Sequence, residues 1–240
     1  VSYAVMKPGS VLKADPVMKR LPSRTERYCL DVAATLANVL TTCEQLEHSV
    51  LYLSSFSPSQ KMKRAGITRQ AQLLYCIENY IIRSQTIYDR LLRLVDSTFE
   101  IHNPPHMLSH ELLISNSHVR RSPVANAMKA FRKITSKYYR DRNAIIHQRQ
   151  FVQDDIRRLE AYTILYTSDN PFAGHVSLRD EITDMVRQIV KEKTKEFTKV
   201  NRDSFIALAE VFTHLNREYE AERRALEMLC GKAEVADLPT

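Results

Sequence analysis

Proline and glycine are absent from four long stretches of the chain, residues 24–57, 67–103, 124–170 and 175–230. They occur in the short segments between these stretches, at Pro58, Gly66, Pro104, Pro105, Pro123, Pro171 and Gly174. Because both residue types interrupt helices, long segments without them favour a bundle of long helices. At 240 residues the chain is long enough to bury a sizeable core. We therefore predict an all-α antiparallel bundle.

Apolar residues recur every three or four positions within these stretches, as expected for amphipathic helices. The clearest stripe lies in the second stretch and consists of Leu73, Leu74, Ile77, Tyr80, Ile81, Ile87, Leu91, Leu94, Val95 and Phe99. The first stretch has a similar stripe, which we expect to be buried: Leu30, Ala33, Leu36, Ala37, Leu40, Leu46 and Val50.

The later helices are predicted from capping residues and breakers. A third helix is expected to begin at Ser122-Pro123, with Ser122 as its N-cap, and to continue through Arg149. A shorter helix is expected from near Asp154 to residues 170–171. The last stretch is expected to be one helix, or two if Asn201 or residues 203–204 cap a second one.

The predicted domain organisation is simple. Residues 1–23 have no sustained period and are expected to form an extended, mildly basic arm. Residues 24–230 are predicted to form a single helical domain, with a core at about 25–170 and a C-terminal helical extension at 178–230. Residues 231–240 are expected to be a tail.

Several cofactors and compartments are disfavoured by the residue pattern. The four cysteines are scattered, which favours reduced thiols in the cytoplasm, and no apolar run is long enough to span a membrane. Four isolated glycines cannot form a phosphate-binding loop. A metal site is also not expected, because Pro104 and Pro105 interrupt the spacing of the nearby histidines, His102, His106, His110 and His118. We therefore predict no cofactor and no metal.

The net charge of +7 is unevenly distributed. Residues 119–149 contain nine Lys and Arg residues and one acidic residue, which gives this segment +8, whereas residues 150–240 carry −4. A local basic stripe is typical of proteins that bind a polyanion, usually nucleic acid. The alternative is a solvated basic helix that is balanced by acidic neighbours in three dimensions.

Arg142, Asn143 and His147 lie together near the end of this basic segment. On a regular helix Arg142 falls on the apolar side with Ile145, where it requires a carboxylate, a second subunit or a ligand. An imidazole transfers protons near neutral pH and a guanidinium stabilises a charged phosphorane, so these groups suit RNA cleavage without a metal. The spacing alone also fits a histidine at a helix end beside a solvated arginine.

Residues 142–147 resemble the R-x4–6-H signature of HEPN domains, which are compact helical bundles found in many prokaryotic RNase toxins and antiviral effectors. Asparagine directly after the arginine is a common form of that signature. Residues 75–83, continuing to Asp89, Arg90, Leu91 and Leu92, resemble the long helix that precedes the motif helix in one bacterial branch of the family. The resemblance covers roughly residues 25–170.

The resemblance implies a metal-independent endoribonuclease that acts as a homodimer, with the motifs of two protomers forming one cleft. Attack by the ribose 2′-hydroxyl would leave a 2′,3′-cyclic phosphate and a 5′-hydroxyl. Arg142 and His147 are then catalytic, and Asn143 supports them.

Further roles follow from the same resemblance and from the charge pattern. Glu78, Asn79 and Arg83 are the expected supporting residues, with Glu78 as the candidate carboxylate for Arg142, while Tyr75 and Tyr80 are expected in the core. The cations expected to contact RNA are Arg132, Lys133, Lys137, Arg140 and Arg149.

The biological setting implied is a toxin–antitoxin or antiviral defence system, with an antitoxin or another regulatory protein as a further partner. Toxins of this family that a nucleotidyltransferase antitoxin silences carry a tyrosine two positions after the histidine, where this chain has Arg149. That difference disfavours adenylylation at this position. Two other hypotheses fit the sequence: a non-catalytic helical module that binds nucleic acid or a protein, and a structural bundle whose basic helix pairs with the acidic C-terminal helices.

Overall fold

A computed structural model describes residues 21–57, 59–104, 106–147, 153–167 and 174–236. For residues 63 and 230–236 it describes the backbone alone. The described residues form helices and no strands, which confirms the predicted all-α class. The elements are α1 (Arg24–Ser54), α2 (Gln60–Arg64), α3 (Arg69–Thr98), α4 (His110–Ser115), α5 (Ser117–Arg121), α6 (Val124–Thr135), the 3-10 turn η2 (Ser136–Tyr138), α7 (Tyr139–His147), α8 (Asp154–Thr167) and α9 (Val176–Ala236).

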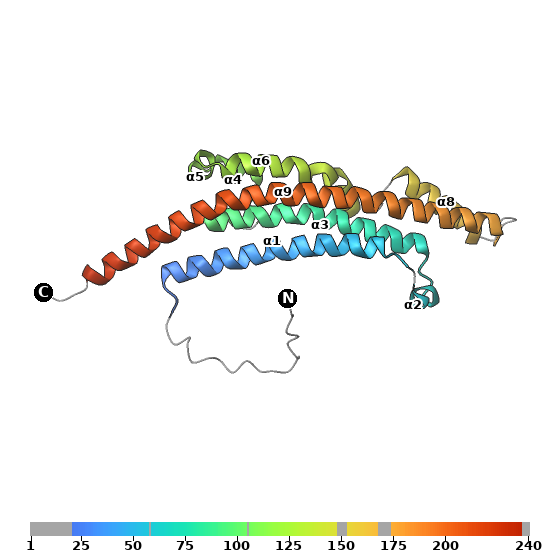
Figure 1. The fold of residues 1–240 in the computed structure, drawn as a ribbon, viewed down its shortest axis with the longest axis horizontal. Coiled ribbons are helices and arrows are strands. Elements are labelled where there is room, and N and C mark those ends of the chain that lie inside the picture. The colour runs from blue at the N-terminus through green and yellow to red at the C-terminus, as the bar shows by residue number, and fades with distance from the viewer. Residues whose placement is uncertain (1–20, 58, 105, 148–152, 168–173, 237–240) are drawn as a thin grey trace, which may run out of the picture.

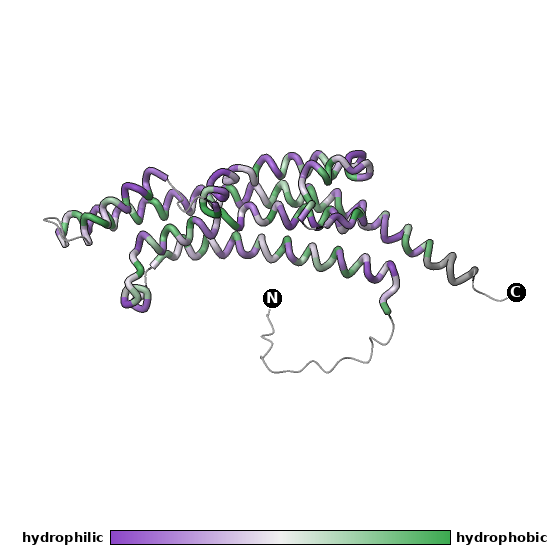
Figure 2. The backbone as a smooth tube through the Cα atoms, turned by 180° about the vertical axis from the view of Figure 1, so that it is seen from behind, coloured by the Kyte–Doolittle hydropathy of each residue, from purple (hydrophilic) through white to green (hydrophobic). Residues whose placement is uncertain are grey.

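Three long helices, α1, α3 and α9, run side by side and form an elongated bundle (Figure 1). Helix α6 packs on α9 and α3 on the side away from α1, and α8 packs on α9 near the start of that helix. Hydrophobic and hydrophilic residues alternate along the long helices (Figure 2), so each one turns an apolar side toward its neighbours. No helix within the described residues combines the length and apolar character needed to cross a membrane.

Local signals in the sequence explain where the long helices begin. Ser23 and Glu26 form a capping box at the start of α1, in which each side chain accepts a hydrogen bond from the backbone N–H of the other residue. Thr68 caps α3 by accepting from Ala71 N at 3.1 Å. Gly66, with φ of 74°, makes the turn between α2 and α3 that a residue with a side chain rarely adopts.

The stripe predicted for the second stretch is confirmed in α3. Tyr80 is fully buried there, whereas Tyr75 is 68% exposed and is not part of the core. The stripe predicted for α1 is correct only in part: Leu46 is buried and Leu36 and Val50 pack against the core, but Leu30 and Leu40 are 58% and 47% exposed. The buried residues of α1 are Tyr28, Val32, Val39, Thr42, Leu46, Ser49 and Leu53.

The third predicted helix is interrupted. It is divided into α6, η2 and α7, because the chain tightens into a 3-10 turn at residues 136–138. Ser122 does not cap α6: its Oγ donates to the carbonyl of Val119 in α5 at 2.9 Å. The last stretch is one helix, α9, in which Asn201 is buried and bonded by a tyrosine of α3, so its side chain does not cap a new helix.

Candidate active site

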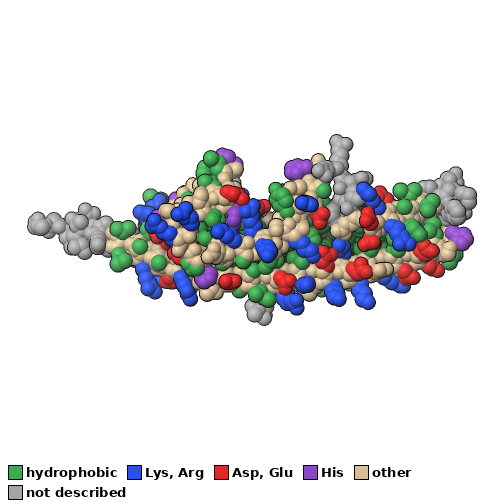
Figure 3. Space-filling model, turned by 90° about the horizontal axis from the view of Figure 1, so that it is seen from above, with side chains coloured by type: hydrophobic (Ala, Val, Ile, Leu, Met, Phe, Trp, Pro, Cys, Tyr) green, Lys and Arg blue, Asp and Glu red, His purple; other side chains and the backbone are tan. Residues whose placement is uncertain are grey.

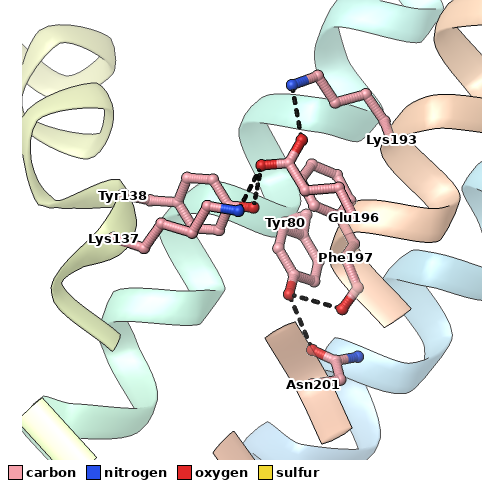
Figure 4. A network of polar contacts seen from close by, with 7 residues as sticks. All are labelled: Tyr80, Lys137, Tyr138, Lys193, Glu196, Phe197 and Asn201. Atoms are coloured by element: carbon pink, nitrogen blue, oxygen red, sulfur yellow. Dashed lines mark hydrogen bonds and ion pairs between the residues drawn. The ribbon is translucent and has the colours of Figure 1, made fainter. Parts of the chain in front are cut away.

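Helix α7, which carries the motif, begins directly after a buried tyrosine. Tyr138 ends η2, and its hydroxyl donates to Oε1 of Glu196 in α9 at 2.8 Å. The same carboxylate accepts from Lys137 Nζ at 2.7 Å and from Lys193 Nζ at 2.9 Å (Figure 4). Glu196 therefore fixes the start of α7 to the long C-terminal helix.

Tyr80 of α3 joins the same cluster through its ring and its hydroxyl. The ring stacks on Phe197 with 3.7 Å between centroids and meets Tyr138 edge-on at 6.0 Å. The hydroxyl donates to the Phe197 carbonyl at 3.2 Å and to Asn201 Oδ1 at 2.9 Å (Figure 4). Aromatic pairs of this kind contribute about 0.5–1.5 kcal/mol beyond area burial. Helices α3 and α9 and the turn η2 are thus joined immediately before α7.

The ion pairs of Glu196 predict a pH dependence of stability. Burial raises the pKa of Glu196, but the hydrogen bonds from Lys137, Lys193 and Tyr138 together outweigh burial and lower this pKa to about 2. A carboxyl group whose pKa is depressed in the folded state stabilises the fold above its ordinary pKa of 4.5, and the contribution is lost as the pH falls through 2. Between pH 4.5 and 2 we expect the wild type to lose about 1–3 kcal/mol more unfolding free energy than Glu196→Gln.

Urea denaturation of both proteins across this pH range measures the difference. Because the other carboxyl groups are the same in the two proteins, their titration cancels in the comparison. Two stability curves that stay parallel down to pH 2 would contradict the prediction.

The three motif residues occupy two different environments on α7. Arg142 and Asn143 are half-buried, and Arg142 Nη1 donates to Asn143 Oδ1 at 3.2 Å. His147, the last residue of α7, is exposed. No residue of α7 is fully buried, but Ile145 is partly buried and packs against the hydrophobic core, and Arg142 is half-buried. The predicted position of Arg142 and Ile145 on the inner side of the helix is therefore correct in part, because this side is half-buried and not fully buried.

Asp89 of α3 is the carboxylate whose titration Arg142 influences. Helix α7 packs against α3. Desolvation by the surrounding protein raises the pKa of Asp89, while the positive charges of Arg142 and Arg93 act to lower it. Burial also raises the pKa of Glu78, but no bond from Glu78 to Arg142 is found among the described residues. The carboxylate whose charge interacts with Arg142 is therefore Asp89, three helical turns beyond Glu78 along the same side of α3, although no hydrogen bond or ion pair joins the two among the described residues.

Arg83 is directed toward α1, and Asn79 bonds Arg83 within α3. Arg83 Nε donates to Asn79 Oδ1 at 2.9 Å, and its Nη1 donates to Gln45 Oε1 of α1. These bonds tie α3 to α1 on one side of α3, whereas Glu78 lies on the side of Asp89. The structure therefore does not bring the three expected supporting residues together at the motif.

Two of the expected RNA-binding cations are paired with carboxylates. Arg132 Nη1 lies 2.8 Å from Oε1 of Glu111, and Lys137 Nζ lies 2.7 Å from Oε1 of Glu196. Pairing neutralises much of the charge that each cation presents to a ligand. The predicted role of Arg132 and Lys137 in RNA binding is therefore weakened by their local contacts.

Lys133 and Arg140 are exposed, and no acidic partner for either is found within the part of the chain that the structure describes. Arg149 lies outside the described residues. Further exposed cations, Arg120, Arg121 and Lys129, extend the basic surface along α5 and α6. Figure 3 shows Lys and Arg side chains gathered over these helices. The positive charge of residues 119–147 is thus a surface feature that is only partly balanced by neighbouring acids.

A comparison with models of protein families shows to which family the chain belongs. The model of the Cthe2314-like HEPN family matches residues 34–216, which is more than half of the chain. The chain belongs to the HEPN family. Membership indicates a nuclease or an RNA-binding module of a family whose members often dimerise. No curated protein and no solved structure gives a significant match.

The match places both the motif helix and most of α9 inside this HEPN region. Two carboxylates were not predicted from the sequence, Asp89 beside the motif helix and Glu196 beside the turn that precedes it. Asp89 belongs to the helix segment that resembles the family, but its interaction with Arg142 depends on the packing of α3 against α7. Glu196 lies 53 residues after Asn143 in the chain, and no spacing signal connects it with the motif.

Proposed function

We propose that this HEPN protein is a metal-independent endoribonuclease whose catalytic residues are Arg142 and His147. His147 removes the proton of the ribose 2′-hydroxyl or returns one to the leaving 5′-oxygen, and Arg142 stabilises the charged phosphorane. Asn143 holds the Arg142 guanidinium through its hydrogen bond of 3.2 Å. The observation that carries the proposal is the placement of these three residues on one short helix at the surface of a HEPN domain.

We propose further that the active unit is a homodimer with a composite site. RNA cleavage of this type needs one group that takes a proton and another that gives one, and α7 supplies a single histidine. Two apolar side chains of α7, Tyr139 and Ile146, are 57% and 46% exposed beside the motif. Apolar surface in this position supports contact between two copies of the helix.

The reaction is tested by incubating the purified protein with RNA in EDTA and analysing the ends of the products. We expect cleavage that leaves 2′,3′-cyclic phosphates and 5′-hydroxyls. Cleavage that stops in EDTA would indicate a metal-dependent nuclease. Intact RNA combined with salt-dependent binding would favour the non-catalytic module that the sequence also allows.

The unpaired cations predict which residues contribute to RNA affinity. The double variant Lys133→Ala/Arg140→Ala is expected to weaken RNA binding at low salt more than Arg132→Ala/Lys137→Ala does. The reason is that the second pair of cations is already bonded to Glu111 and Glu196. For single-stranded RNA, loss of two phosphate contacts lowers the slope of log K against log salt by about 1.4. Fluorescence anisotropy at several salt concentrations measures both quantities, and equal effects of the two double variants would contradict the assignment.

We propose a cytoplasmic toxin–antitoxin or antiviral defence setting, with an antitoxin or regulatory protein as the second partner. Residues 24–230 are proposed to act as one domain, since a continuous hydrophobic cluster joins α1, α3, α6 and α9. Adenylylation two positions after His147 is not part of the proposal, because Arg149 occupies that position.

A further inference from the structure

A cavity of about 400 Å³ lies between α3, α8 and α9, at the end of the bundle where α3 begins. Each helix contributes polar side chains to its lining. They are Arg69 and Gln70 of α3, Thr163 and Tyr166 of α8, and Arg179 and Thr183 of α9. None of these residues belongs to the motif on α7 or to the carboxylate cluster around Glu196. The cavity is therefore distinct from the candidate active site.

The charge of this cavity is unbalanced. Arg69 and Arg179 reach it from different helices, and no Asp or Glu is found among its described lining residues. Among the residues that the structure describes, the side-chain contact found for Arg69 joins its Nη1 to the neutral Thr183 Oγ1 at 3.4 Å. Arg187, two turns beyond Arg179 on α9, is by contrast paired with a carboxylate, since its Nη1 bonds Asp184 Oδ1 at 3.0 Å. Two guanidinium groups beside one concave surface without a carboxylate favour an anionic ligand.

The partial charges of the helix ends at the cavity do not cancel the excess of positive charge. Helix α3 begins there with a partial positive charge, and α8 ends there at Thr167 with a partial negative charge. Each partial charge is equivalent to about half an elementary charge, so these two approximately cancel. Helix α9 begins at Val176 with Arg179 in its first turn, and its partial positive charge has the same sign as the two arginines. The full positive charges of Arg69 and Arg179 remain.

The available hydrogen-bond donors further limit which anions can bind in this cavity. Thr163 and Thr183 already donate their hydroxyl protons to carbonyls within their own helices, at 2.8 and 2.9 Å. Donors to a ligand therefore come mainly from the guanidinium groups, whose planar arrays of N–H groups match the oxygens of a phosphate. A volume of about 400 Å³ exceeds that of a lone phosphate and lies in the range of small-molecule sites.

We propose that the cavity between α3, α8 and α9 binds a phosphate ester, with Arg69 and Arg179 holding the phosphate group. The phosphate belongs either to a small metabolite or to the 5′ end of an RNA strand, and the chemistry of recognition is the same for both. The inference does not depend on ribonuclease activity, because it uses no residue of α7.

Isothermal titration calorimetry of the full chain in low-chloride buffer tests the proposal. The probes are inorganic phosphate, pyrophosphate, ribose 5-phosphate, and a short RNA with either a 5′-phosphate or a 5′-hydroxyl. We expect saturable binding of at least one phosphate-bearing probe, with affinity reduced about tenfold or more in Arg69→Ala and in Arg179→Ala. Arg187→Ala, which removes a matched exposed arginine of α9, is expected to bind as the wild type does.

Each outcome has a defined meaning. Binding of the small probes identifies a metabolite as the source of the phosphate, whereas a gain in affinity confined to the 5′-phosphorylated RNA identifies an RNA end. Absence of saturable binding by all probes overturns the proposal, and so does binding that survives in both arginine variants. Because Arg69 and Arg179 are exposed, the variants are expected to fold, and thermal unfolding checks this directly.

Discussion

Replacing His147 with alanine is expected to lower the rate of RNA cleavage by about 10²–10⁴-fold, because a positioned acid or base contributes that much to proton transfer. Arg142→Ala is expected to cost about 10²–10³-fold, the usual effect of removing one group that stabilises a developing charge. His147 is exposed at the end of α7, so its loss should leave the fold unchanged. Single-turnover cleavage in EDTA measures both rates.

A matched histidine provides the control for this result. His106 is exposed in the segment between α3 and α4 and belongs to neither the motif nor the basic surface. His106→Ala should cleave RNA at the wild-type rate. Full activity in His147→Ala, with folding confirmed by circular dichroism, would remove this histidine from the proposed mechanism.

Mixing wild-type and inactive chains tests whether the site is shared between protomers. A mixed dimer of wild-type and His147→Ala chains has one histidine at the composite cleft, where the proposed reaction uses two. When wild-type chains are refolded with an excess of His147→Ala chains, cleavage is expected to fall below the fraction of wild-type chains. Cleavage that falls only in proportion to that fraction, although mixed dimers form, would indicate that each chain acts with its own complete motif.

The Phe197→Ala substitution is expected to lower the free energy of unfolding by about 3–5 kcal/mol, the usual cost of removing a large aromatic side chain from a core. Phe197 is fully buried, and its ring stacks on Tyr80 at 3.7 Å between centroids and meets Tyr138 edge-on at 5.9 Å. The substitution leaves a cavity where α3, η2 and α9 meet. Urea denaturation at neutral pH measures the loss, and the dependence of ΔG on urea should keep a similar slope.

An exposed residue of the same helix provides the comparison. Ile206 is 66% exposed on α9, and Ile206→Ala should change stability by no more than about 0.5 kcal/mol. A loss below about 1 kcal/mol in Phe197→Ala would show that the aromatic cluster is not a main contact between α9 and the rest of the bundle.

The cluster also connects stability with the candidate active site. Tyr138 is the residue immediately before α7, and it contacts both Phe197 and Glu196. Loosening this contact is expected to affect the orientation of Arg142 and His147 as well as the fold. Cleavage by Phe197→Ala should therefore be compared at a temperature at which both proteins are folded.

The long helices were predictable because their signals are local. Breaker-free stretches, a capping box at Ser23 and an apolar stripe on α3 act within a few turns of the chain. The buried side of α1 was only partly predictable from its leucines, since Leu46 is buried but Leu30 and Leu40 face outward while Thr42 and Ser49 face inward. Both hydroxyls donate to carbonyls of their own helix, and Thr42 Oγ1 also accepts from Arg90 of α3 at 2.7 Å, so these polar groups are hydrogen-bonded although they are buried.

The sequence by itself determined the all-α class and the candidate motif of Arg142, Asn143 and His147. Tertiary structure alone decided which residues surround that motif. It placed Asp89 near Arg142, directed Arg83 toward α1, and paired Tyr138 with Glu196. Helix formation depends on side chains and backbone groups three or four residues apart, so a linear pattern records it. Contacts between helices depend on how whole helices pack, and residues distant in the chain become neighbours only after packing.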